Sequence, residues 1–170
     1  MKFKKSTKSD IDNIMKIITQ AQNYFKEKGI DQWQNNYPNA EVISNDIVKG
    51  ESYVLIKDEQ IIATTVITFK KEKTYETIYN GQWISENQYG TIHRIAVDNA
   101  YKGLGLSHKI IKYAEEICLN NDVYSLRVDT HEDNIPMQNL LKKNEFKYCG
   151  VIYLEDGAKR IAFEKILEKN

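Results

Sequence analysis

The residues whose types and spacing could do chemistry lie in the middle of the chain, where His93 precedes the turn Lys102-Gly103-Leu104-Gly105-Leu106-Ser107. β-Branched residues up to Val97 predict a strand, and helical spacing of apolar residues resumes at Leu106. The glycines therefore lie at a strand-to-helix junction. Because glycine takes φ above zero easily, successive backbone N–H groups can converge at the positive end of the helix. We expect this turn to bind an anion such as a pyrophosphate.

The composition limits the classes of function. The chain has 170 residues, 41% of them hydrophobic, which predicts one domain over residues 1–170. Its 24 basic and 24 acidic residues leave no net field to gather nucleic acid or an anionic membrane, so we expect neither as a partner. No apolar run has signal-peptide length or the roughly 20 residues of a membrane span, which predicts a cytoplasmic protein.

Cys118 and Cys149 are the only cysteines. Two widely spaced thiols are too few for a disulfide framework or a zinc site, so we expect no metal. We interpret both as small buried apolar residues.

The elements that position the central turn follow from periodicity and turn residues. The first half predicts a short strand, two helices and an antiparallel hairpin, at residues 2–5, 11–29, 41–49, 53–56 and 61–69. Residues 70–88 are charged and aromatic without a clean period, so this segment is either a lid or an insertion between strands.

The second half predicts strands at 91–97 and 123–130 around a helix at 104–120, then a helix from Asn134 to Asn144 and a hairpin over 146–166. A strand, a helix and another strand imply a crossover and a parallel pair. The order β-α-α-β-β-β-α-β-α-β-β predicts an α/β fold with a mixed sheet and helices on both faces.

With these elements in place, the central turn resembles the hallmark of the GNAT superfamily of N-acetyltransferases, Arg or Gln, two residues, Gly, one residue, and Gly or Ala. Lys102 stands for the first position and Ser107 for the last. Lysine keeps the positive charge and serine is small, so we expect anion binding to survive both departures. Asn134 to Phe146 resembles the later motif of this family, and the resemblance in element order covers nearly all of residues 1 to 165.

The resemblance implies a central, twisted, mostly antiparallel sheet of about seven strands with one splayed parallel pair. It also implies acetyl-CoA as co-substrate. The pantetheine arm would contact the backbone of the strand segment Ile95, Ala96 and Val97, and Asn134 would face this arm. The pyrophosphate would meet the N–H groups of the turn, namely Lys102, Gly103, Leu104, Gly105, Leu106 and Ser107.

Direct attack of an amine on a thioester requires a base, because an alkylamine with a pKa near 10 is protonated at neutral pH. His93 is the candidate, since it shares a strand face with Ile95 and Val97 if the alternation is unbroken, and some arylalkylamine members of the family place a histidine there. A structural histidine is the alternative, and a bulge would reverse its face. His131 is a second candidate base, for which a surface-loop or capping role is the alternative.

The departing thiolate also needs a proton. Many family members supply it from a tyrosine in the helix after the Asn, where this chain has Leu141. Tyr148 is a candidate acid, and Cys149, Tyr153 or solvent are alternatives. A thiolate of pKa about 8.5 to 9 can also leave unassisted.

The expected function is transfer of an acetyl group to a primary amine of a small molecule, with a protein amine as the second choice. A non-catalytic acyl-CoA-binding module is the alternative reading, and a homodimer is left open. An ATP site is disfavoured because no Gly-Lys-Ser/Thr pattern follows the glycines. Side chains that could line an acceptor pocket, with core packing or solvation as the alternative for each, are Tyr24, Asp31, Trp33, Tyr37, Asp46, Tyr79, Trp83 and Glu86.

Overall fold

The computed structural model describes residues 1–169, in which seven strands form one mixed sheet in the order β1-β2-β3-β4-β5-β7-β6. The strands are β1 (Lys2–Lys5), β2 (Ser52–Lys57), β3 (Gln60–Thr68), β4 (Gly90–Val97), β5 (Ser125–Thr130), β6 (Lys147–Tyr153) and β7 (Lys159–Ile166). The α-helices are α1 (Ile11–Lys28), α2 (Ala40–Val48), α3 (Leu106–Asn120) and α4 (Ile135–Lys143), and the 3-10 turns are η1 (Lys8–Asp10), η2 (Lys73–Tyr75) and η3 (Asn99–Tyr101).

The strand pairing confirms the mixed sheet expected from the sequence. β1 with β2, β2 with β3, β5 with β7 and β6 with β7 are antiparallel. β4 and β5 are parallel, with Gly90 opposite Leu126 and Thr91 opposite Arg127. The α/β fold class and the parallel pair are therefore confirmed.

The chain divides into two compact units. The first contains Met1–Ile67 and His93–Tyr113, and the second contains Thr68–Ile92 and the chain from Ala114 onward. β4 contributes its first residues, Gly90 to Ile92, to the second unit and the remainder to the first.

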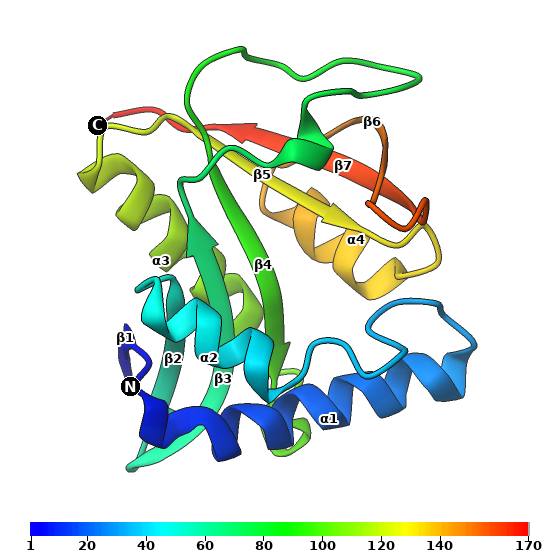
Figure 1. Ribbon diagram of the computed structural model, residues 1–170. Helices are drawn as coiled ribbons and strands as arrows, with labels where there is room; N and C mark the ends of the chain where they lie inside the picture. Colours follow the sequence, from blue (N-terminus) through cyan, green and yellow to red (C-terminus); the bar gives the residue numbers. More distant parts are fainter. Residues whose placement is uncertain (170) are drawn as a thin grey trace. The chain divides into compact units, whose positions relative to one another are not determined.

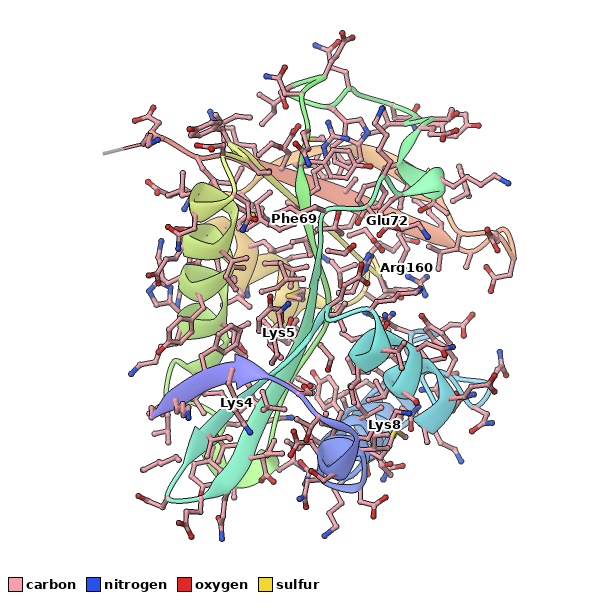
Figure 2. The ribbon with its side chains drawn as sticks, turned by 60° about the vertical axis from the view of Figure 1, so that its left-hand side comes forward. Lys4, Lys5, Lys8, Phe69, Glu72 and Arg160 are labelled. Atoms are coloured by element: carbon pink, nitrogen blue, oxygen red, sulfur yellow. The ribbon has the colours of Figure 1, made fainter. Side chains whose placement is uncertain are left out.

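In the first unit, helices cover both faces of the strands (Figure 1). Alternation along the strands sends neighbouring residues to opposite faces. Val54 of β2 packs with Ile14 and Ile18 of α1, and its neighbour Leu55 packs with Ile110 of α3. Lys4 and Lys5 come from β1 and Lys8 from the turn before α1 (Figure 2).

In the second unit, residues 70–89 form an insertion that packs on the sheet. Tyr75 and Tyr89 join a core cluster with Ile152 of β6 and Ala162 of β7, and Tyr79 forms an isolated antiparallel bridge with Val151. Figure 2 labels Phe69 and Glu72 at the start of this segment and Arg160 on β7. Of the two alternatives for this stretch, the structure shows an inserted segment with its own aromatic core.

Local backbone geometry shifts some predicted boundaries. α3 begins at Leu106 and not at Leu104, because Gly105 has a left-handed φ of 73°. β5 begins at Ser125 and not at Val123, after Asp122 with a φ of 55°. In the described part of the chain, every helix is too short or too polar to cross a bilayer.

Candidate active site

The glycine turn joins β4 to α3 and is held in place at its start. The backbone N–H of Asp98 donates to the carbonyl of Ile62 on β3 at 2.9 Å, and the Asp98 carboxylate accepts from the N–H of Ala100 at 2.8 Å. Gly103 and Gly105 then take φ values of 80° and 73°. Glycine adopts these angles without the steric cost that other residues pay, so glycine is favoured at both places.

The N-terminus of α3 can bind an anion. The N–H of Lys109 donates to the carbonyl of Gly105 at 3.1 Å, which makes Gly105 the first acceptor of the helix. The N–H groups of Leu106, Ser107 and His108 thus have no acceptor one turn earlier in the helix, and the helix dipole is positive there. A Cβ built on Gly103 or Gly105 would meet no heavy atom within 4 Å, so the backbone is open to a ligand. These residues fit a pyrophosphate.

Two contacts tie this turn to α1. The ammonium of Lys102 lies 5.1 Å from the ring centroid of Tyr24, and the N–H of Asn99 donates to Oε1 of Gln20 at 2.8 Å. Tyr24, which the sequence offers as an acceptor-pocket residue, therefore has a structural contact with the turn. The role of Lys102 in anion binding stays a prediction.

The backbone of β4 is irregular at Arg94, which has a φ of 50°. A left-handed residue inside a strand is characteristic of a β-bulge, and we call this feature the β4 kink. Beyond Arg94 the faces are regular, since Ala96 packs on the side of α1 and α2 while Ile95 and Val97 pack on the side of α3.

The β4 kink determines which face of the strand His93 shares with its neighbours. A Cβ on Gly90 would point at Sγ of Cys118 in α3, so alternation along the first part of β4 places His93 on the opposite face. The condition under which His93 shares a face with Ile95 and Val97, unbroken alternation, is therefore not met. His93 is half-buried, and its carbonyl accepts from the hydroxyl of Thr65 at 3.2 Å. Its role as a base stays a prediction.

Arg94 itself belongs to a polar cluster that the sequence did not suggest. Its Nε and Nη2 donate to the two carboxylate oxygens of Asp46 on α2 at 2.9 and 2.7 Å, and its Nη1 donates to the Tyr37 hydroxyl at 3.0 Å. Asp46 is buried and Tyr37 is exposed. Asp46 and Tyr37, first considered as acceptor-pocket residues, are thus partners of the kinked residue.

In the second unit, Asn134 caps α4. Its Oδ1 accepts from the N–H of Met137 at 3.2 Å, and Pro136 occupies the first turn. Its contact with a cofactor stays a prediction. Nδ1 of His131 accepts from the N–H of Asp133 at 3.0 Å, which is the capping role considered as the alternative to a base.

The candidates for the acid differ in exposure. Leu141 is completely buried, whereas Tyr148 and Tyr153 are exposed. The Tyr148 ring meets Phe163 edge-on at 5.9 Å. The Cys149 thiol donates to the Lys147 carbonyl at 3.4 Å, and burial raises its pKa to about 11. Tyr148 therefore has the free access to solvent that a proton shuttle requires, and its role stays a prediction.

The aromatic residues of the insertion have structural partners. The guanidinium of Arg127 on β5 lies 4.1 Å from the Trp83 ring and 4.0 Å from the Tyr89 ring. The Tyr75 hydroxyl donates to Asp129 at 2.6 Å, and burial, together with this carboxylate, raises the pKa of Tyr75. Trp83 thus packs against Arg127 and Tyr75, which is the structural alternative to a pocket role.

Comparison with known proteins identifies the family. The model of the acetyltransferase (GNAT) family matches residues 16–146, and the chain belongs to this family. An uncharacterized N-acetyltransferase of Bacillus subtilis is 21% identical over 143 residues, which cover 83% of this chain and 78% of the relative. An S-alkylcysteine N-acetyltransferase of the same organism is 25% identical over 122 residues, covering 70% of this chain and 61% of the relative.

Solved structures agree with the fold. A GNAT-family acetyltransferase from Streptococcus agalactiae is 34% identical, with a TM-score of 0.89 and coverage of 99% of this chain and 96% of that one. A Salmonella typhimurium protein solved with its cofactor acetyl-CoA is 11% identical, with a TM-score of 0.71 and coverage of 100% and 95%. At 11% identity, the similarity to the Salmonella protein shows a shared fold and nothing more.

Proposed function

We propose that this GNAT-family protein transfers the acetyl group of acetyl-CoA to the primary amine of a small molecule. The observation that carries the proposal is the glycine turn, in which Gly103 and Gly105 are open at the N-terminus of α3. Open backbone N–H groups at a helix N-terminus suit the pyrophosphate of coenzyme A. The Salmonella protein, which shares the fold, was solved with acetyl-CoA.

When bound, acetyl-CoA supplies a thioester that an amine can attack. The amine nitrogen forms the amide bond, the carbon–sulfur bond breaks, and the sulfur leaves as a thiolate. His93 takes a proton from the substrate ammonium, so that the neutral amine attacks. Solvent takes the second proton that the nitrogen loses as the amide forms, and Tyr148 or solvent returns a proton to the thiolate. The β4 segment Ile95, Ala96 and Val97 receives the pantetheine arm, and the N–H groups of Lys102 to Ser107 hold the pyrophosphate.

A small-molecule acceptor is proposed ahead of a protein amine. Two relatives with printed substrates act on small molecules, since one is an S-alkylcysteine N-acetyltransferase and the other, 29% identical over 72 residues, is a streptothricin acetyltransferase of Escherichia coli. The first of these names specifies an amino-acid derivative. We therefore place amino acids and their derivatives first among the acceptors to be tried.

The experiment has two stages. Calorimetry measures whether the purified protein binds acetyl-CoA, and a thiol-release assay then follows turnover with S-alkylcysteines, other amino acids, polyamines, arylalkylamines and peptide N-termini. Absence of binding at millimolar acetyl-CoA would disprove the proposal. Binding without thiol release over the whole panel would favour the non-catalytic acyl-CoA-binding module instead.

A further inference from the structure

Arg94 is held in an unusual backbone conformation by groups distant in the sequence. Residues other than glycine adopt a φ of 50° at an energetic cost and persist there only when the surroundings impose it. Arg94 forms a bidentate ion pair with Asp46, the geometry in which a guanidinium binds a carboxylate most strongly. The Arg94 side chain is 14% exposed and that of Asp46 is 6% exposed, so solvent screens the pair little.

The residues on either side of Arg94 are fixed as well. The carbonyl of His93 accepts from the Thr65 hydroxyl at 3.2 Å, and Ala96 is packed into the cluster that contains Ile43 of α2. Asp46 lies on the same helix as Ile43, and its own carbonyl accepts from the N–H of Glu51 at 3.0 Å. α2 is therefore anchored independently of Arg94 and can act as a fixed support for the kink.

The kink lies between the proposed catalytic base and the proposed pantetheine-binding segment. His93 precedes Arg94, and Ile95 to Val97 follow it. The φ and ψ of Arg94 decide in which direction the N–H of Ile95 and the groups after it point, because rotation at one residue reorients the peptide that follows. A change at Arg94 would thus misalign the β4 backbone with the pantetheine arm.

We propose that Asp46, through its ion pair with Arg94, is a positioning residue that holds the β4 kink in the conformation that binds acetyl-CoA. The inference rests on the proposed function. The Tyr37 hydroxyl completes the cluster, and since Tyr37 is exposed its contribution is the smaller one.

The test compares glycine with alanine at position 94 in a protein in which Asp46 is replaced by the uncharged Asn. Asp46→Asn/Arg94→Ala and Asp46→Asn/Arg94→Gly both remove the ion pair without leaving a buried charge. In an ordinary strand position alanine is better than glycine. At the kink we expect the opposite order, because glycine enters the left-handed region freely. The alanine variant should bind acetyl-CoA at least about tenfold more weakly than wild type, and the glycine variant about threefold or more tighter than the alanine variant.

Two controls separate positioning from general damage. Val48→Ala changes an exposed residue of α2 and should leave acetyl-CoA affinity unchanged. ADP carries a pyrophosphate but no pantetheine arm, so the amide NMR shifts of Gly103 and Gly105 on titration with ADP should be the same in wild type and in both double variants. Backbone chemical shifts of residue 94 report directly whether the left-handed conformation is kept.

The outcomes decide between the proposals. Equal acetyl-CoA affinity in wild type and in the alanine variant, or a glycine variant weaker than the alanine variant, would overturn the inference while the proposed function stands. A wild-type protein that binds no acetyl-CoA would overturn the proposed function and with it the role of the kink. The ordered loss described above, with unchanged ADP shifts, would support the ion pair of Asp46 and Arg94 as the element that positions the kink.

Discussion

Arg127 and Glu164 form a buried ion pair, with 3.1 Å between Nε and Oε1 and side chains that are 5% and 0% exposed. Glu164 on β7 also accepts from the Ser125 hydroxyl at 2.6 Å and from the backbone N–H of Ile84 in the insertion at 2.5 Å. Nη2 of Arg127 donates to the Ser85 carbonyl at 2.6 Å. The pair therefore joins β5, β7 and the insertion through charge-assisted hydrogen bonds, which are stronger than neutral ones.

Glu164→Gln is expected to destabilise the protein strongly. The amide has the shape of the carboxylate but no charge, so Arg127 would remain as an unpaired buried cation, a change that costs about 3–5 kcal/mol. Urea denaturation measures the free energy of unfolding of the variant and of wild type. The matched control is Lys159→Ala, which breaks the exposed pair between Lys159 and Glu132 and should leave the free energy of unfolding nearly unchanged. Equal losses in the two variants would contradict the role given to the buried pair.

Cys118 and Cys149 should make the protein less stable at alkaline pH. Burial raises the pKa of Cys118 to about 12 and that of Cys149 to about 11, with smaller contributions from Glu115 and Glu164 respectively. Unfolded thiols ionise near pH 8.5. Because the folded pKa values are the higher ones, the stabilisation is complete below about pH 8.5 and is lost as the pH rises towards 11 or 12.

Urea unfolding at a series of pH values checks this expectation. Between pH 8.5 and 11 the free energy of unfolding of wild type should fall more steeply than that of Cys118→Ala/Cys149→Ala. Parallel curves would contradict the expectation. Alkylation of both thiols at pH 8 should be slow in the folded protein and fast in urea, because the thiolate is the reactive form.

Local sequence signals predicted the parts of this fold that depend on local geometry. The helical spacing of α1 and α3, the Asn134 cap and the glycine turn each follow from propensities within a few residues, and the structure confirms these elements. The strand-helix-strand order of residues 91–130 predicted the parallel pair, which the structure confirms. The resemblance to the family added acetyl-CoA as the co-substrate.

Tertiary contacts determine what the sequence could not reveal. Arg94 reads as an ordinary strand residue, and its left-handed backbone is explained only by Asp46, 48 positions away. This one residue invalidates the alternation used to place His93. Glu164 likewise reads as a polar residue on a hairpin, yet it is completely buried because Arg127 and the insertion satisfy its oxygens. No periodic pattern contains information about a partner so far away in sequence.

Gly105→Val should abolish acetyl-CoA binding and leave the protein folded. A Cβ at this position meets no heavy atom within 4 Å, and the strain of a φ of 73° costs about 1–2 kcal/mol. The added side chain would, however, occupy the space from which a pyrophosphate approaches the backbone. Calorimetry should show a loss of affinity of about a hundredfold or more, or about 2.7 kcal/mol.

Gly157→Val is the matched control for this change. Gly157 has a φ of 85° in the turn between β6 and β7, and a Cβ there also meets nothing within 4 Å. The two variants thus carry comparable backbone strain, which thermal unfolding can verify. Normal acetyl-CoA affinity in Gly105→Val, or an equal loss in Gly157→Val, would refute the assignment of the anion site.

His93→Ala should lower turnover at pH 7 by about 10²-fold or more, within the range that general base catalysis contributes, with little change in acetyl-CoA affinity. The loss should depend on the acceptor. An amine with a pKa near 10 needs a base to remove its proton, whereas an amine with a pKa near 7 is half unprotonated already and should lose less. Added imidazole should restore part of the activity. Wild-type turnover in His93→Ala at every pH would exclude this residue as the base, and a loss confined to His131→Ala would assign the role to the histidine that caps Asp133.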